Sequence, residues 1–231
     1  ESKKNLGRIK NRLLLAEKSQ YHWLLFIDVD TNPIDENFLK NYIKQKDNGR
    51  IFFGGCIFKE PVNVNRSLRY KFGKKREEIS SIQRNKNPFK YISSNNFMCK
   101  RDLIIEIFSE IESISYGNDY IFGSILKKNS IEVVHFDNPV LIEYIDENPI
   151  FIQKTHQALE NIKNNHKKGK LQKHSISILK AYRFLDSFFM RKLFVKLTNI
   201  FMVKLEKNLH KENPNLFLFD IYRLNYLCKI N

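Results

Sequence analysis

Apolar and polar residues follow two different spacings in the first two thirds of the chain. Residues 6–18 repeat an apolar side chain every three or four positions, which predicts a helix. Residues 23–27 form an unbroken apolar run, which predicts a short central strand buried on both faces. Similar patterns predict further helices at 36–46, 100–111 and 116–128, and further strands at 51–58, 91–99, 131–136 and 140–144. This alternation of strands and helices indicates an α/β sheet.

The last third of the chain has helical spacing throughout, with breaks near Gly169 and Pro214. We therefore expect two domains, an α/β domain over residues 1–149 and an all-α appendage over residues 150–231. Residues 61–88 are polar, basic and weakly periodic. They predict a long irregular connection, of the kind that often serves as a lid.

Charge sets the appendage apart from the rest of the chain. The 231 residues carry a formal net charge of +15, and residues 151–211 hold fourteen Lys and Arg against three acids. The three cysteines are far apart without Cys-x-x-Cys spacing, which argues against a disulfide framework or zinc site and favours a reducing compartment. The sequence shows no signal peptide and no membrane-spanning run. We expect a cytoplasmic protein, or one bound peripherally at the inner face of the membrane.

The apolar run at 23–27 ends in Asp28-Val29-Asp30. Carboxylates at the carboxyl end of such a strand lie where open α/β sheets bind ligands. At positions i and i+2 of a turn, Asp28 and Asp30 can converge on one divalent cation, which prefers oxygen ligands and can neutralise a diphosphate. The alternative is a polar turn, in which Asp30 or Thr31 caps the next helix.

Asp119, at the start of the helix predicted at 116–128, is a further acidic candidate. Taken alone, it is best explained as a residue that caps the helix or interacts with its dipole. Near a cation bound to a leaving diphosphate, it would be the base that takes a proton from an incoming hydroxyl. Together, the acidic pair and Asp119 predict a metal-dependent transfer site.

These residues belong to an ordered set of short motifs. The segments are Gly7–Arg12, Leu24–Asp30, Gly54-Gly55, Ser94–Phe97 and Gly117–Asp119, followed in the tail by Asn148–Thr155 and Pro214–Leu224. In this order they resemble glycosyltransferase family 2, the inverting enzymes of the A-type nucleotide-sugar fold. The resemblance covers most of the chain. It implies a partial A-type, Rossmann-like sheet followed by an all-α appendage.

The resemblance implies transfer of a sugar from a nucleotide-diphosphate donor, expected to be a UDP-sugar, to a hydroxyl of a glycan or lipid-linked acceptor, with Mn²⁺ or Mg²⁺. It implies Asp30 as the direct metal ligand, Asp28 nearer the ribose or cation, and Asp119 as the general base. Further residues implied at the site are Lys10, Asn11, Gly54 and Gly55 on the donor side and Ser94, Asn95 and Asn96 on the acceptor side. The Gln-x-x-Arg-Trp motif of processive members is absent, which favours a single transfer.

The chain departs from the family pattern in two places. The family begins with a strand–helix–strand half that binds uracil and ribose, and we expect this half upstream of Glu1 in a longer protein. Many members also supply a His ligand in the segment that here reads Val140–Tyr144, where no His stands. Glu143, and His135 from the preceding predicted strand, are the candidates to replace it.

One segment of the appendage has an amphipathic pattern. Ile178, Ala181, Tyr182, Leu185, Phe188 and Phe189 share one arc of a helix, opposite Lys180, Arg183, Ser187 and Arg191. Such a helix either lies on an anionic membrane surface or packs against a domain. Beyond Arg191 the charges scatter, and Lys204 falls among apolar residues, so we favour packing.

Three classes of function remain open. The first is a metal-dependent glycosyltransferase of the hexosyl-transferring type. The second is a basic module without catalysis that binds nucleic acid or a membrane surface, because positive charge alone gives salt-dependent binding to phosphate. No nucleic-acid partner is expected, because the tail has no recognised reading motif and its aromatic residues follow a core-like arc. The third is a different Asp-x-Asp metalloenzyme, such as a nucleotidyltransferase.

Overall fold

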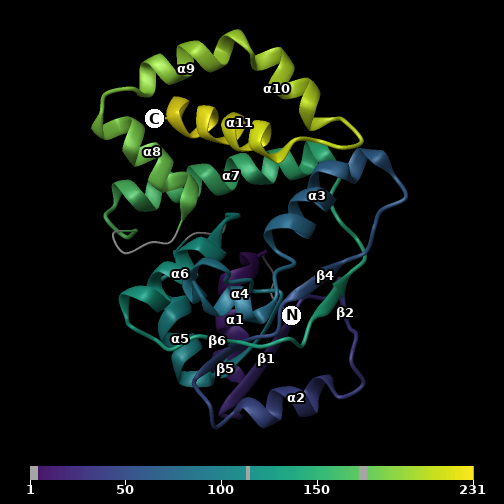
Figure 1. Cartoon of the computed structure of the whole chain (residues 1–231). Helices are drawn as coiled ribbons and strands as arrows, with labels where there is room; N and C mark the ends of the chain where they lie inside the picture. Colours follow the sequence, from purple (N-terminus) through teal and green to yellow (C-terminus); the bar gives the residue numbers. More distant parts are fainter. Residues whose placement is uncertain (1–4, 113–114, 172–175, 231) are drawn as a thin grey trace.

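The strands form two small mixed sheets, and the C-terminal helices lie above them in Figure 1. The computed structural model describes residues 5–112, 115–171 and 176–230. One sheet has the strand order β1-β5-β3-β6, and the other has the order β2-β7-β4. The strands are β1 (Trp23–Ile27), β2 (Thr31–Pro33), β3 (Ile51–Phe53), β4 (Cys56–Phe58), β5 (Asn96–Lys100), β6 (Val134–His135) and β7 (Val140–Ile142). The predicted α/β class with a helical C-terminal region is confirmed.

Strand β1 lies at the end of the order of the four described strands, so the prediction of a central strand is wrong. Among the described strands it pairs only with β5, in antiparallel register. Leu24 and Phe26 pack against the main hydrophobic core on one face. Trp23 and Leu25 pack against a second core on the other face. An apolar run therefore reports that both faces of a strand are covered, but it carries no information about the strand's edges.

Helices of the N-terminal part lie close to their predicted bounds. They are α1 (Gly7–Lys18), α2 (Phe38–Gln45), α5 (Arg101–Ser109) and α6 (Asn118–Lys128). Phe97 of β5 stacks between Phe26 and Phe53, with ring centroids 4.8 and 5.6 Å away. Phe108 of α5 and Phe122 of α6 close the same aromatic group at 6.5 and 5.7 Å from Phe97. These rings join the sheet to the helices that cover it.

The segment 61–88 is largely helical, so the prediction of an irregular connection is wrong. It contains η1 (Val64–Arg66), α3 (Ser67–Arg76) and α4 (Ser81–Asn85), and η2 (Pro88–Lys90) follows. Helix α3 has few apolar positions, which explains the missing helical signal. Leu68 and Phe72 pack with Phe219 of α11 (Leu216–Lys229), and this tertiary packing stabilises the helix.

Gly54 and Gly55 divide the strand predicted at 51–58 into two. Strand β3 ends before them in one sheet, and β4 begins after them in the other. Gly55 has a φ of 87°, in the left-handed region that favours glycine. A Cβ atom on Gly54 would lie 2.4 Å from the backbone oxygen of Asn138. The glycine pair therefore permits a close approach of the Asn138 backbone to Gly54, within the chain itself.

The C-terminal helices pack on one another and on the α/β part. Besides α11, they are α7 (Asn148–Lys167), α8 (Ser177–Ser187), α9 (Arg191–Ile200) and α10 (Met202–Leu209). Gly169 and Pro214 lie between helices, so both predicted breaks are confirmed. The main core contains Leu159, Leu179 and Leu227 together with residues of the sheet, and the division into two domains stays a prediction. None of the described helices is long and apolar enough to cross a bilayer.

Candidate functional site

A backbone turn presents Asp28 and Asp30 at the end of β1. The Asp28 amide donates to the Asn95 oxygen at 2.9 Å, which extends the pairing with β5 beyond the strand. The Thr31 amide (3.1 Å) and hydroxyl (2.8 Å) both donate to the Asp28 backbone oxygen. The predicted polar turn is therefore present. It is closed by backbone and Thr31 groups and does not use the two carboxylates for these bonds.

Two arginines of α1 bind the Asp28 carboxylate. Arg12 Nη2 donates to Oδ1 at 2.5 Å, and Arg8 Nη2 lies 3.5 Å from Oδ2. Burial has the largest effect on this carboxyl and raises its pKa. Arg8 and Arg12 lower the pKa, whereas the charges of Asp30 and Asp119 raise it further. The three carboxylates are thus close enough to influence one another.

The sequence pointed to Lys10 and Asn11 of α1, and the structure leaves both exposed and outside the described lining of the site cavity. Arg8 and Arg12 were missed. Their spacing of four residues puts them on one face of the helix and was the available signal. Arg12 is buried, and its guanidinium lies over the rings of Phe26 and Phe97 at 5.6 and 5.7 Å.

Asp119 lies in the first turn of α6. The helix is preceded by Gly117 with a φ of 83°, and a Cβ atom there would lie 2.9 Å from the Cβ of Ala158 on α7. No side chain of the described residues caps this helix at Gly117. A carboxylate in the first turn is favoured by the helix dipole, so a structural role remains compatible with this position.

Asp28, Asp30 and Asp119 line one cavity of about 1510 Å³ between the α/β part and the C-terminal helices. We call these three carboxylates the acidic end. The sequence predicted that Asp119 faces Asp28 and Asp30 across one site. In the structure the three carboxylates line the same cavity, in agreement with this prediction. Small-molecule sites usually have volumes of about 300–1,000 Å³, so this cavity has room for two substrates.

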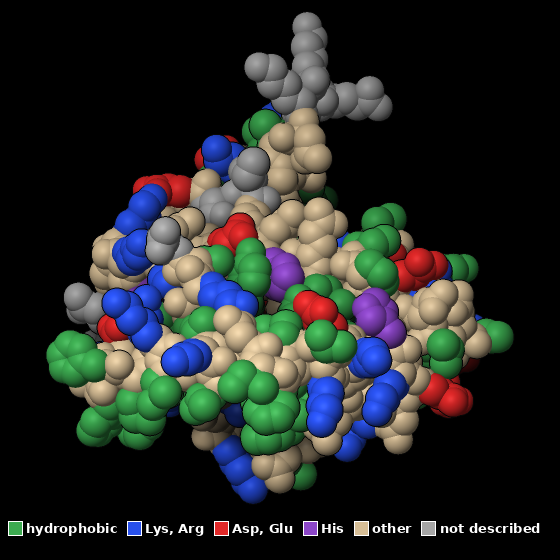
Figure 2. Space-filling model, turned by 90° about the horizontal axis from the view of Figure 1, so that it is seen from above, with side chains coloured by type: hydrophobic (Ala, Val, Ile, Leu, Met, Phe, Trp, Pro, Cys, Tyr) green, Lys and Arg blue, Asp and Glu red, His purple; other side chains and the backbone are tan. Residues whose placement is uncertain are grey.

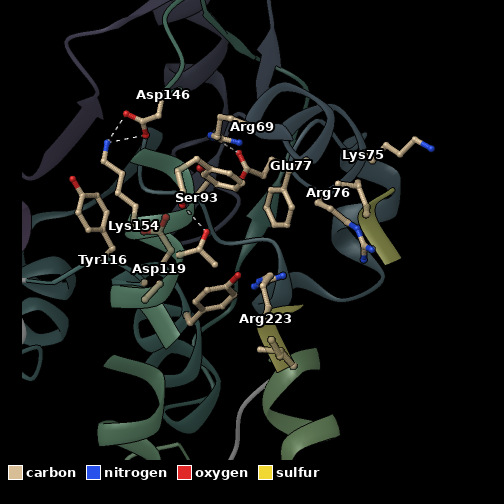
Figure 3. Close-up of a pocket in the computed structure, with 18 of the residues that line it drawn as sticks. Arg69, Lys75, Arg76, Glu77, Ser93, Tyr116, Asp119, Asp146, Lys154 and Arg223 are labelled. Atoms are coloured by element: carbon tan, nitrogen blue, oxygen red, sulfur yellow. Dashed lines mark hydrogen bonds and ion pairs between the residues drawn. The ribbon is translucent and has the colours of Figure 1, made fainter. Parts of the chain in front are cut away.

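Basic side chains from η1, α3 and α11 line another part of the cavity. This cationic wall consists of Arg66, Arg69, Lys71, Lys75, Arg76 and Arg223. Figure 3 shows Lys75 and Arg76 on the side away from Asp119 and Tyr116. The lining is therefore richest in cations on this side of the cavity, where Glu77 and Asp220 also lie, while Arg8 pairs with Asp28 at the acidic end.

Aromatic rings and carboxylates hold the arginines of the cationic wall in place. Arg69 pairs with Glu77 at 2.8 Å, and its guanidinium lies 4.8 Å from the Phe58 ring centroid. Arg223 pairs with Asp220 at 3.2 Å. Arg66 Nε, Arg69 Nη1 and Arg223 Nε are buried and have no hydrogen-bond partner in the described structure. These nitrogens are enclosed by protein, so an anionic ligand in the cavity would meet the other N–H groups of the wall.

Of the three predicted acceptor-side residues, Asn95 lines the cavity and accepts a bond at 2.8 Å from the hydroxyl of Ser93, a lining residue that the sequence did not single out. Ser94 and Asn96 are buried. The Asn96 amide donates to the backbone oxygens of Gly55 and Asn138, both at 2.9 Å. Asn96 therefore has a structural role inside the protein, because its side-chain amide satisfies backbone oxygens of segments that follow β3 and β6.

Gly54, Gly55 and His135 also lie away from the cavity lining. Arg84, itself buried, donates to the backbone oxygen of Gly54 at 3.3 Å and to His135 Nδ1 at 3.1 Å. His135 Nε2 donates to the Pro88 oxygen at 2.9 Å, because a carbonyl oxygen can only accept. Both ring nitrogens of His135 therefore have partners within the protein, and its placement gives no support to the predicted role as a metal ligand. We call Arg84, Asn96, His135 and Asn138 the polar core.

The antiparallel pairing of β7 with β2 brings Glu143 beside the turn that carries Asp30. Its Oε1 is 3.0 Å from Lys59 Nζ, its Oε2 accepts a bond from Asn32 Nδ2 at 3.4 Å, and it lines a hollow of about 320 Å³ next to the site cavity. Strands β7 and β4 pair in parallel. Glu143 follows β7 and Lys59 follows β4, so the two side chains meet at the same end of the pair. The carboxylate is thus engaged by Lys59 and Asn32, and its role as a third metal ligand stays a prediction.

Asp30 is the carboxylate of the acidic end best placed to hold a divalent cation, because Asp28 is engaged by Arg8 and Arg12. No group of three or more His, Cys, Asp or Glu that could hold a metal ion occurs among the described residues. Mg²⁺ is commonly bound by one or two carboxylates together with substrate phosphates and water. The acidic end therefore fits a cation that arrives with a diphosphate.

Comparison of the chain with models of known protein families and with curated proteins finds no match. The assignment of a function consequently depends on the site itself.

Proposed function

We propose that this chain is the catalytic part of a metal-dependent, inverting glycosyltransferase with a nucleotide-diphosphate sugar as donor and a hydroxyl group as acceptor. One observation carries the proposal. A single cavity joins Asp28 and Asp30, at the end of a strand, with Asp119, at the start of a helix. Such a site offers an electrophilic end for the leaving diphosphate and a carboxylate base for the acceptor.

In the proposed reaction, Asp119 takes the proton of the acceptor hydroxyl, and the oxygen of this hydroxyl bonds to the anomeric carbon. The bond between this carbon and the diphosphate oxygen breaks, and its electron pair leaves with the nucleotide diphosphate. Attack from the face opposite the leaving group inverts the anomeric configuration. Asp30, with Asp28 behind it, would hold Mn²⁺ or Mg²⁺, which supplies positive charge to the diphosphate.

The cationic wall supports a substrate that carries negative charge. It brings Arg66, Arg69 and Arg223 to the lining of the cavity. Guanidinium groups form strong bonds to phosphate or carboxylate oxygens. A volume of about 1510 Å³ accommodates a donor sugar and an acceptor together. A partial A-type sheet, a UDP-linked donor, a single transfer and a cytoplasmic location are parts of the same proposal.

The test measures release of nucleotide diphosphate from a panel of sugar nucleotides by the full-length protein with Mn²⁺. We expect Asp30→Asn and Asp119→Asn each to lower the rate by about 100-fold or more. Asp102→Asn is the matched control, because Asp102 lies on α5 and is exposed outside the cavity lining. An Asp119→Asn variant with the wild-type rate would refute the base assignment.

The same assay separates the proposal from nucleotidyl transfer, the other Asp-x-Asp chemistry considered. A nucleotidyltransferase releases pyrophosphate from plain nucleoside triphosphates. Pyrophosphate release that requires Asp30, without turnover of any sugar nucleotide, would replace the proposed reaction by that one.

A further inference from the structure

Residues 184–203 expose an unusual number of large apolar side chains. They are Phe184, Phe188, Phe189, Met190, Leu193, Leu197, Ile200, Phe201 and Val203, and we call this set the apolar face. Phe189 is 93% exposed and Ile200 is 70% exposed. Figure 2, which looks down on the C-terminal helices, shows hydrophobic side chains gathered on this side with Lys and Arg among them. A concentration of exposed apolar side chains of this kind indicates an interaction site.

Helix α9 shows that the apolar face is separate from the core. Phe194 and Val195 pack against the main core, and Thr198 is hydrogen-bonded to Asn225 of α11. Leu193 and Leu197, four residues apart, point to another side of the same helix and are exposed. Packing on α11 therefore accounts for one apolar side of α9 and leaves the other uncovered in the described structure.

Phe189, in the turn between α8 and α9, is exposed and has a strained backbone conformation. The Phe189 amide donates to the Asp186 oxygen at 3.0 Å, and the Met190 amide donates to the Leu185 oxygen at 2.8 Å. This Schellman motif places Phe189 at the left-handed position, with a φ of 56°, where glycine is the usual residue. A bulky side chain at such a position is an outlier. Since Phe189 is almost fully exposed, burial in this chain does not offset the strain.

Charge identifies the occupant of the apolar face. Residues 180–207 contain seven Lys and Arg against two acids, and one of the acids, Asp186, is paired with Arg191 at 2.8 Å. Lys192 and Lys196 are exposed on α9 beside Leu193 and Leu197. Contact between two copies through this face would bring like charges together. An anionic lipid surface instead satisfies the cations and buries the apolar side chains in one step.

We propose that the apolar face docks on an anionic lipid bilayer, with α9 lying in the plane of the headgroups. Phe189 and the apolar side chains of α9 enter the boundary between headgroups and acyl chains, and Lys192 and Lys196 bind lipid phosphates. The helical arc for which the sequence favoured packing does pack over most of its length, because Ile178, Tyr182 and Leu185 contact the main core. Phe188 and Phe189, at the end of the same arc, are exposed and belong to the apolar face. The proposal does not depend on the proposed sugar transfer.

The test is co-sedimentation of the whole chain with vesicles of phosphatidylcholine alone or with one third phosphatidylglycerol. We expect binding to the anionic vesicles to be stronger by about tenfold or more and to weaken with added salt. Leu197→Gln combined with Ile200→Gln should lower it about tenfold. Lys192→Gln combined with Lys196→Gln should lower it severalfold and reduce its salt dependence.

Helix α2 provides matched controls on the opposite side of the molecule (Figure 1). Leu39 and Ile43 are four residues apart and each 60% exposed, and Lys40 and Lys44 accompany them. Leu39→Gln with Ile43→Gln, and Lys40→Gln with Lys44→Gln, should leave binding unchanged. Equal loss in the α2 and α9 variants would overturn the proposal. So would a wild-type chain that ignores anionic vesicles and instead forms dimers that Leu197→Gln and Ile200→Gln dissociate.

Discussion

The polar core and the acidic end are both groups of polar side chains at the ends of strands, and they differ in how fully the chain supplies their partners. In the polar core, Arg84 donates to the backbone oxygens of Phe53, Ile79 and Phe136 at 2.9–3.0 Å. At the acidic end, Asp28 alone is paired with arginines, and Asp30 and Asp119 face the cavity. Polar groups whose bonding capacity is filled are structural, whereas groups with spare capacity at a cavity are candidates for ligands.

This difference predicts opposite responses to substitution. Changes in the polar core should affect folding, because they leave buried groups without partners. Changes at Asp30 and Asp119, which have no such partners among the described residues, should affect turnover and leave folding almost unaltered. The predictions that follow test this separation.

The largest effect on stability is expected from Arg84→Met. The change leaves several buried carbonyl oxygens without a donor and should lower the free energy of unfolding by about 3–5 kcal/mol. Urea titration followed by circular dichroism measures it. Lys86→Met, at an exposed position beside α4, is the control and should cost little. A loss of less than about 1 kcal/mol for Arg84→Met would show that water or rearranged backbone replaces the guanidinium.

His135 should make the polar core sensitive to acid. Burial lowers the pKa of His135 to about 4, with a smaller contribution from the nearby charge of Arg84. The unfolded chain binds a proton near the ordinary histidine pKa, and the folded chain does not until about pH 4. The contribution to stability is therefore complete above about pH 6.5 and is lost as the pH falls toward 4, about 3 kcal/mol in total.

The measurement is the free energy of unfolding of the wild type and of His135→Asn at several pH values. Asn can still accept a bond from Arg84 but does not titrate. The difference between the two proteins isolates His135 from the other histidines. A difference that stays constant between pH 7 and pH 5 would contradict the buried neutral histidine.

The sequence predicted most elements but could not distinguish the polar core from the site. Periodicity located α1, β1 and α6, because these elements have continuous apolar faces. Helix α3 escaped prediction, since it is stabilised by contact with α11 and half of its residues are Lys or Arg. Asn95 and Asn96 are adjacent in sequence, and only the register of β5 decides that one lines the cavity and the other is buried.

Gly54→Ala should have a moderate effect on stability. The new Cβ would lie 2.4 Å from the Asn138 backbone oxygen and 2.6 Å from Asn96 Nδ2. Because these atoms belong to the polar core, the strain should cost about 1–3 kcal/mol in the free energy of unfolding. In Gly49→Ala the nearest atom is a Val134 methyl carbon at 3.3 Å, so this control should be close to neutral. A Gly54→Ala protein of normal stability that loses only donor binding would instead restore Gly54 to the site.

The smallest effect separates two neighbouring positions of α1. Arg8 lines the cavity 3.5 Å from the Asp28 carboxylate and is more than half exposed, so Arg8→Gln should lower stability by less than about 1 kcal/mol. In the proposed reaction it removes a positive charge beside the diphosphate, and we expect kcat/KM to fall about fivefold, most strongly at low salt. Lys10→Gln removes the same charge from a position outside the described lining and should change kcat/KM little. Equal effects of the two substitutions would mean that α1 acts only through its overall charge, and that contact with Asp28 contributes nothing to turnover.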